Sequence, residues 1–134
     1  MTKRILIVDD DVAAMNLLKT GLEKTGAFEV RAESSAKRVL PAAREFRPDL
    51  ILLDVMLADG DGGEIAARIM ADQALKKIPI VFLTSLLAEW EESAGGSLRG
   101  PIPILAKPAS LEKILHCIEP KLGIVRQPKP VGAV

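Results

Sequence analysis

The sequence predicts an α/β fold, a doubly wound five-stranded parallel sheet with five helices. Two observations carry this prediction. Short apolar runs do not alternate with polar residues, which is typical of parallel strands covered on both faces. Segments of helical periodicity lie between these runs, so strand and helix alternate five times along the 134 residues. Right-handed crossovers between such units place helices on both faces of one sheet.

Five segments are predicted to be strands. Four are apolar runs, and the remaining segment, residues 28–32, alternates apolar and polar side chains. Alternation indicates a strand with one face open to water, and it suits an edge of the sheet. In chain order the predicted strands are Ile5–Val8, Phe28–Ala32, Leu50–Leu53, Ile80–Leu83 and Ile102–Ala106.

The first predicted helix follows the first strand. Asp11 is the predicted N-cap, and Gly26 suits the left-handed residue that often ends a helix. Apolar residues at helical spacing predict the face that is buried against the sheet. That face comprises Ala14, Leu17, Leu18 and Leu22.

The second helix is predicted from Ser34, as N-cap, towards Phe46, and Pro41 predicts a kink or an irregular turn within it. The third helix is predicted from Asp61 to about residue 71. Asp61 and Glu64 have the spacing of a capping box, in which each side chain bonds to the backbone N–H of the other.

A fourth helix is predicted from near Ser85 through Trp90. The fifth is predicted to begin at Ser110, as N-cap, and to bend or end at Pro120. Residues 1–122 are therefore predicted to form one domain. Residues 123–134 have no periodic apolar face and read as a disordered tail or a truncated linker.

The composition argues against several classes of function. Lys and Arg (18) balance Asp and Glu (18), which leaves no basic surface for nucleic acid or an anionic membrane. No apolar run approaches the ~20 residues of a membrane span, and the chain starts with a strand pattern rather than a signal peptide. A single cysteine, Cys117, excludes an internal disulfide. We expect a cytoplasmic domain without a nucleic-acid or membrane partner.

Residues with carboxylate, hydroxyl or ammonium side chains follow four of the predicted strands. Asp9 and Asp10 follow the first strand, Asp54 the third, Thr84 the fourth and Lys107 the fifth. The carboxyl ends of parallel strands meet at one edge of the sheet, where ligands bind. Carboxylate oxygens suit Mg²⁺, and a divalent cation would offset their mutual repulsion. The sequence therefore predicts a Mg²⁺ site at this edge.

These residues resemble the signature of the CheY-like receiver domain of response regulators. The acidic pair, the aspartate, the threonine and the Lys-Pro dipeptide occur in the family's order over about residues 3–120. Each motif is common by itself, whereas all four at the ends of the correct strands are specific. The resemblance implies a flavodoxin-like (βα)5 receiver fold and a role in two-component signalling.

The resemblance also implies a phosphoacceptor and a set of metal ligands. Asp54 would accept a phosphoryl group from a sensor histidine kinase or a phosphotransfer protein. Asp10 would bind Mg²⁺ directly and Asp9 mainly through water. Asp54 itself and the backbone carbonyl of Met56 would complete the protein ligands.

Two further residues would act in the switch. Lys107 would pair with Asp54 and then with a phosphoryl oxygen, and Thr84 would bind another oxygen and move on activation. Family members usually have a cis peptide bond at the position of Lys107–Pro108. Such a domain catalyses only its own phosphorylation and dephosphorylation, and it signals by changing shape towards a downstream protein target that the sequence does not name.

The chain departs from the family pattern at two positions near this site. Ala58 replaces a proline that usually follows the phosphoacceptor, which predicts a less rigid loop after the third strand. Ile104 replaces the aromatic residue of the fifth strand, so the usual rotation of an aromatic ring is excluded.

Two other functions fit parts of the pattern. A phosphohydrolase of the haloacid-dehalogenase type needs two aspartates spaced like Asp9 and Asp11, but the short chain has no cap domain. A degenerate receiver would serve only as a binding scaffold, and the complete set of acidic residues, Thr84 and Lys107 argues against it. Incubation with acetyl phosphate and Mg²⁺ distinguishes the three, because only a receiver retains one acyl phosphate.

Overall fold

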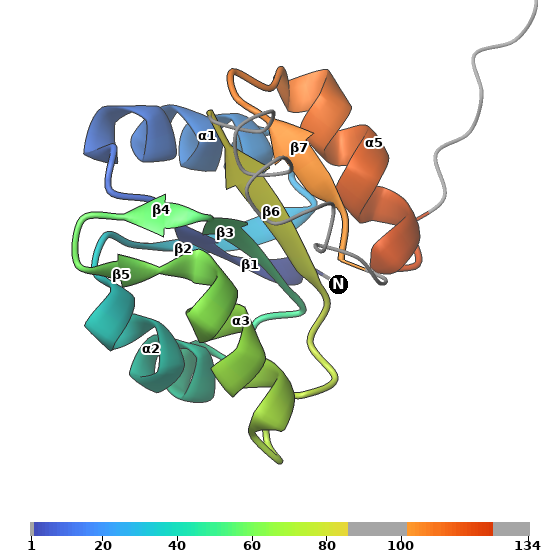
Figure 1. The fold of residues 1–134 in the computed structure, drawn as a ribbon. Coiled ribbons are helices and arrows are strands. Elements are labelled where there is room, and N and C mark those ends of the chain that lie inside the picture. The colour runs from blue at the N-terminus through green and yellow to red at the C-terminus, as the bar shows by residue number, and fades with distance from the viewer. Residues whose placement is uncertain (1, 86–101, 125–134) are drawn as a thin grey trace, which may run out of the picture.

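The computed structural model describes residues 2–85 and 102–124, and its central feature is a five-stranded parallel sheet (Figure 1). The sheet strands are β1 (Lys3–Val8), β2 (Phe28–Glu33), β3 (Leu50–Asp54), β6 (Ile80–Thr84) and β7 (Ile104–Ala106). Two short strands, β4 (Met56–Leu57) and β5 (Gly60–Asp61), form a separate antiparallel hairpin. The helices are α1 (Val12–Lys24), the 3-10 helix η1 (Ala36–Arg38), α2 (Val39–Phe46), α3 (Gly62–Ala71) and α5 (Leu111–Lys121).

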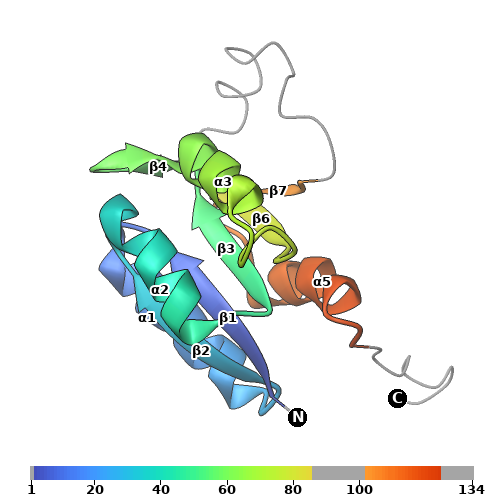
Figure 2. The same cartoon turned by 90° about the horizontal axis from the view of Figure 1, so that it is seen from below.

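Helices cover both faces of the sheet. α1 and α5 lie on one face, and α2 and α3 lie on the other (Figure 1, Figure 2). The strand order is β2-β1-β3-β6-β7, and every neighbouring pair is parallel. The doubly wound α/β fold is therefore confirmed, with β2 at an edge as its alternation predicted. The predicted fourth helix, from near Ser85 through Trp90, lies outside the described residues.

The two cores follow from the alternation of side chains along each strand. In β1, Leu6 and Val8 pack beneath α2 and α3, whereas Ile5 and Ile7 pack beneath α1 and α5. None of these four side chains has exposed surface. Burying one such side chain contributes roughly 1.5–3 kcal/mol, so a run that is apolar at every position is stable only in the interior of the sheet. Among the described residues, no helix is long and apolar enough to cross a bilayer.

The five predicted strands agree with the structure to within two residues at each end. The largest differences are at strand starts: β1 begins at Lys3 rather than Ile5, and β7 begins at Ile104 rather than Ile102. Pro103 explains the later start because proline has no N–H to donate to a neighbouring strand. Its carbonyl still accepts a hydrogen bond from the Phe82 N–H at 2.9 Å.

The predicted ends of α1 are confirmed, but its predicted buried face is only partly correct. The Asp11 side chain accepts a hydrogen bond from the Ala14 N–H at 3.0 Å, and Gly26 has a φ of 80°. Leu22 is buried, whereas Leu17 is 76% exposed and Met15 takes an interior position at 4%. The helix packs on a stripe displaced from the predicted one, and Leu17 lies at its margin.

The start of the second helical segment differs from the prediction. Ser34 is not the N-cap. The segment opens with η1, whose N-cap is Ser35, and the Ser35 side chain accepts no hydrogen bond from the backbone N–H groups of η1. Pro41 lies in the first turn of α2, where its missing N–H breaks no intrahelical hydrogen bond. The irregular turn that Pro41 predicted is thus a 3-10 turn placed before α2.

The caps of α3 and α5 are confirmed. The Asp61 side chain accepts a hydrogen bond from the Gly63 N–H at 2.8 Å, rather than from the Glu64 N–H that the predicted capping box requires. The Ser110 Oγ accepts one from the Lys113 N–H at 3.1 Å. Pro120 lies in the last turn of α5, which ends one residue later.

Candidate functional site

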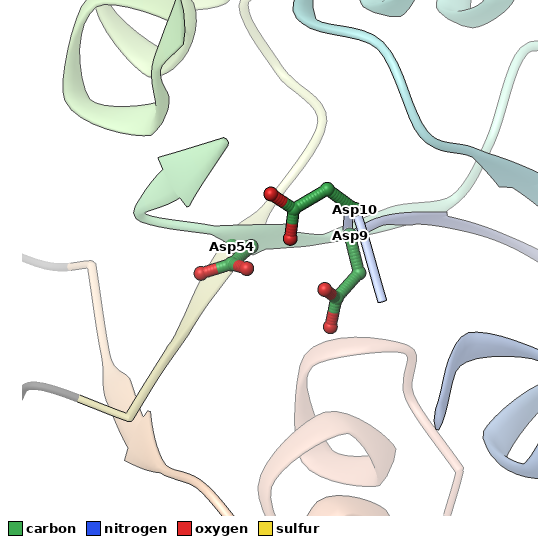
Figure 3. Close-up of side chains that lie close together, drawn as sticks. All are labelled: Asp9, Asp10 and Asp54. Carbon is green, nitrogen blue, oxygen red and sulfur yellow. The ribbon is translucent and has the colours of Figure 1, made fainter. Parts of the chain in front are cut away.

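Three carboxylates lie together at the carboxyl edge of the sheet. Asp9 and Asp10 follow β1, and Asp54 ends β3, which pairs directly with β1. One carboxylate oxygen from each lies within 4.8 Å of the others. Figure 3 shows the three side chains gathered in one place. Asp9 is 4% and Asp54 6% exposed, whereas Asp10 is an exposed residue. The register of two neighbouring strands therefore builds the cluster.

Lys107 supplies the ammonium that ion-pairs with two of these carboxylates. Its Nζ lies 2.5 Å from Asp9 Oδ2 and 3.2 Å from Asp54 Oδ2. The residue follows β7, and its backbone N–H donates to the Thr84 carbonyl at 2.8 Å. The Lys107–Pro108 peptide bond is cis, as the resemblance implied.

The second oxygen of each buried carboxylate is also hydrogen-bonded. Asp9 Oδ1 accepts from the Asp11 N–H at 2.9 Å, and Asp54 Oδ1 accepts from the Met56 N–H at 3.2 Å. Among the described residues, no buried side-chain nitrogen or oxygen lacks a hydrogen-bond partner. Backbone donors and one lysine therefore orient both carboxylates.

Thr84 completes the set of predicted side chains at this edge. It ends β6, whose Leu83 is paired with Asp54 in the neighbouring strand. The residue is 1% exposed. Burial places its hydroxyl within the protein beside the strand that carries Asp54, rather than in the solvent.

The sequence model of the response regulator receiver domain matches residues 5–119 of the chain. The chain belongs to this family. The polar-differentiation response regulator DivK of Brucella ovis is 31% identical to this receiver domain over 125 residues, which cover 92% of the chain and 98% of DivK.

Solved structures agree with this assignment. A putative response regulator from Chloroflexus aurantiacus superposes with a TM-score of 0.80 at 28% identity, covering 92% of this chain and 99% of its own. The same fold is found in the receiver domain of a sensor histidine kinase from Pseudomonas aeruginosa. Its TM-score is 0.81 at 23% identity, and the alignment covers 92% of this chain and 99% of that one. The acidic cluster of the receiver domain fits the phosphoacceptor site of the family.

Burial and charge act in opposite directions on the site's ionisable groups. Burial raises the pKa of Asp54, and this outweighs the opposing effects of Lys107 and the Met56 N–H. Burial alone would lower the pKa of Lys107, but the hydrogen bond to Asp9 and the charges of Asp54 and Asp9 together raise it. Lys107 therefore remains an ammonium over the physiological range, and Asp54 is more costly to ionise than an aspartate in water.

The donors at this site fit a hard divalent cation. Mg²⁺ prefers oxygen ligands and usually keeps several of its waters. When all groups are ionised, three carboxylates face one ammonium, so an excess of negative charge remains. Asp10 is exposed and can accept a solvated ion, whereas Asp9 is already bound to Lys107. The residues present therefore fit Mg²⁺.

The predicted site residues Asp9, Asp10, Asp54 and Lys107 come together, with Thr84 on the adjacent strand. Sequence reasoning missed the hairpin of β4 and β5 directly after Asp54. The dipeptide Asp59–Gly60 was the nearest signal, because Asp-Gly is a frequent turn sequence in hairpins, although the turn residues here are Ala58 and Asp59, and Gly60 already pairs with Leu57. The strands on either side are only two residues long, too short to show a period.

Proposed function

We propose that this receiver domain accepts a phosphoryl group on Asp54 from a sensor histidine kinase or a phosphotransfer protein, and signals by a phosphorylation-dependent change in shape. One observation carries the proposal. The Asp54 carboxylate lies at a strand end with the acidic pair Asp9 and Asp10 beside it and the Lys107 ammonium 3.2 Å away.

Phosphoryl transfer depends mainly on how the protein positions the reacting groups and stabilises their charge. An Asp54 oxygen forms a bond to phosphorus, and the bond between phosphorus and the donor atom breaks, with its electron pair leaving on the donor. Negative charge spreads over the phosphoryl oxygens during this step. The Lys107 ammonium and the Thr84 hydroxyl would stabilise that charge.

Four residues would hold the metal ion: Asp9, Asp10, Asp54 and, through its backbone carbonyl, Met56. Bound Mg²⁺ would neutralise negative charge on the phosphoryl oxygens. Direct binding by Asp10 and water-mediated binding by Asp9 agree with their surroundings, because Asp10 is exposed and Asp9 is engaged by Lys107 and the Asp11 N–H.

A groove beside the site gives the phosphodonor protein a surface on which to dock. It has a volume of about 560 Å³ and extends from Asp9 and Lys107 along α1 to Leu111 and Ile114 of α5. Leu17 of α1 lines it and is 76% exposed. An apolar wall next to a charged reaction centre suits a protein partner better than a small polar molecule.

The remaining proposals concern context. The domain catalyses only its own phosphorylation and dephosphorylation, works in the cytoplasm, and passes its signal to a protein target rather than to nucleic acid or a membrane. We assign the domain to residues 1–122 and a tail or linker to residues 123–134. Leu122 is 8% exposed and packs in the core beneath α1 and α5, and Ile124 still packs against that core and donates to the Glu119 carbonyl at 2.9 Å. These contacts support a boundary close to Leu122, within a few residues of it.

Acetyl phosphate with Mg²⁺ tests the proposal. We expect intact-mass spectrometry to show one added phosphoryl group on the wild type and none on Asp54→Asn, which keeps the size of the side chain but removes the nucleophile. Uptake by Asp54→Asn at the wild-type rate would overturn the assignment. Continuous release of phosphate would instead indicate a hydrolase, and no modification of wild type a binding scaffold.

A further inference from the structure

The hairpin of β4 and β5 controls the backbone next to the phosphoacceptor. Its strands pair antiparallel, with Met56 opposite Asp61 and Leu57 opposite Gly60. Met56 is the second residue after Asp54, and its N–H donates to Asp54 Oδ1 at 3.2 Å. Any movement of the hairpin therefore moves the backbone of Met56 relative to the Asp54 carboxylate.

This hairpin is too small to be stable by itself. A two-stranded hairpin is at best marginally stable in water, and each strand here has only two residues. The turn has Ala58 rather than a proline that would fix its backbone. A contact outside the hairpin is needed to hold it in one conformation.

Asp59, at the tip of the hairpin, makes such a contact. Its Oδ2 accepts a hydrogen bond from the Ser35 Oγ at 2.6 Å, and its Oδ1 accepts one from the Ala36 N–H at 2.8 Å. The Ser35 side chain does not cap η1. The Asp59 carboxylate accepts the Ala36 N–H instead, and it therefore caps η1 although it lies 23 residues further along the chain. These hydrogen bonds lower the pKa of Asp59, and the bond from Ser35 has the larger effect.

The packing of Gly60 gives independent evidence for the same contact. A Cβ on Gly60 would lie 2.6 Å from the Cβ of Ala36, which is closer than two carbon atoms can approach. The backbone of the hairpin therefore lies directly against the first residue of η1. The hydrogen bonds of Asp59 and the absence of a side chain at Gly60 both serve this approach.

We propose that Asp59 is a positioning residue of the phosphorylation site, which fixes the Met56 backbone beside Asp54 by tying the β4–β5 hairpin to η1. The inference rests on the proposed function and adds to it a residue outside the acidic cluster. Loss of this tie leaves the sheet and its cores in place, but it allows Met56 to move relative to Asp54. Metal affinity and the rate of phosphorylation then fall together.

A matched pair of variants tests the role of Asp59. Asp59→Ala removes the bonds to Ser35 and Ala36. Asp72→Ala is the control. Asp72 also accepts one side-chain bond, from Arg44 at 2.6 Å, and one backbone bond, from Ala74 at 2.8 Å, but it lies at the C-terminal end of α3, away from the hairpin. Asp59→Asn is the conservative variant, since its amide oxygen can still accept from the backbone N–H.

The first measurement is the affinity for Mg²⁺ by isothermal titration calorimetry, and the second is hydrogen exchange of the amides of residues 56–61 in EDTA. We expect Asp59→Ala to weaken Mg²⁺ binding about tenfold, as is typical for loss of a residue that orients a metal ligand, and to speed exchange in the hairpin. Asp59→Asn should recover most of the affinity, and Asp72→Ala should match wild type in both measurements.

The outcomes separate this inference from the proposed function. The first case is a wild type that binds Mg²⁺ and is phosphorylated on Asp54. If Asp59→Ala then matches wild type within twofold in Mg²⁺ affinity and in the exchange rate of the hairpin amides, the role of Asp59 alone is overturned. Wild type that neither binds Mg²⁺ nor takes up a phosphoryl group would overturn the proposed function and this inference with it. An equal loss of affinity in Asp72→Ala would show a general effect of stability and would also overturn it.

Discussion

Substitution of Gly62 by alanine is the sharpest test of how the strand that ends in Asp54 is built. Gly62 is the first residue of α3, and its N–H donates to the Val55 carbonyl at 2.7 Å. A Cβ at this position would lie 2.3 Å from the Asp54 carbonyl oxygen and 2.8 Å from the Val55 Cα. Both neighbours are backbone atoms, so no side-chain rotation can relieve the clash.

The geometry sets the size of the effect. Ordinary contact begins near 3.4 Å, so the Asp54–Val55 backbone must move by roughly 1 Å. Overpacking of this kind costs about 1–3 kcal/mol, and the helix propensity of alanine returns less than about 1 kcal/mol of it. We expect a net loss of about 2 kcal/mol, which is a decrease in Tm of roughly 8 °C for a domain of this size. A displacement of 1 Å at a reacting group can also slow phosphorylation by about 100-fold.

Gly63→Ala is the matched control, one residue further along the same helix. A Cβ there would meet the Asp61 side chain at 3.3 Å, with no backbone atom within contact distance. This variant should be as stable as wild type or slightly more stable. Thermal melts followed by circular dichroism compare the three proteins, and acetyl phosphate uptake at a temperature where all are folded gives the rate. Equal melting temperatures for Gly62→Ala and Gly63→Ala would refute the reasoning.

Three further predictions use the charges at the site and the orientation of α1. Because burial raises the pKa of Asp54, its ionised form opposes folding above that pKa, so Asp54→Asn should increase the free energy of unfolding at pH 7. The gain should shrink as the pH falls through the raised pKa and vanish below the unfolded value of about 3.9, and urea denaturation in EDTA from pH 3 to pH 7 measures it. Lys107→Ala should lower the Tm by leaving Asp9 and Asp54 without their ammonium, and added Mg²⁺ should raise the Tm of this variant by more than that of wild type; equal increments in thermal melts would contradict the pairing. Leu17→Glu should change the free energy of unfolding by less than about 0.5 kcal/mol because the side chain is exposed. Met15→Glu should be severely destabilising because it buries a charge. If urea denaturation ranks the two variants the other way, the buried face of α1 is the one predicted from periodicity.

Most of the fold could be predicted because its determinants are local or depend on burial. The run Ile5–Val8 is apolar at every position because both faces of β1 are covered, and this is visible without coordinates. The N-caps Asp11, Asp61 and Ser110 each act on a backbone N–H within three residues. Such signals lie in short stretches of sequence, and the structure confirms them.

The features that were missed depend on contacts between distant residues. The apolar pattern of α1 admits two neighbouring stripes, and packing against the sheet selects the one with Met15 and Leu22 rather than the one with Leu17. The hairpin after Asp54 has strands too short for a period, and Asp59 binds residues 23 and 24 positions earlier in the chain. The buried stripe of α1 and the partners of Asp59 are both fixed by tertiary contacts, so neither can be read from a single stretch of sequence.

The position of Lys107 explains how the chain accommodates carboxylates at the end of a buried strand. Removal of an ionised carboxylate from water costs several kcal/mol unless it is paired and hydrogen-bonded. Asp9 and Asp54 are the two buried members of the cluster, and Lys107 binds both, at 2.5 and 3.2 Å. Asp10 keeps its hydration because it is exposed. The ammonium thus offsets the cost where burial makes it largest.

The Lys107 ammonium is shared between two carboxylates, however, so neither of them is fully neutralised. The remaining negative charge favours a divalent cation. With a phosphoryl group on Asp54, as proposed, release of Lys107 from Asp9 would free the ammonium to pair with a phosphoryl oxygen.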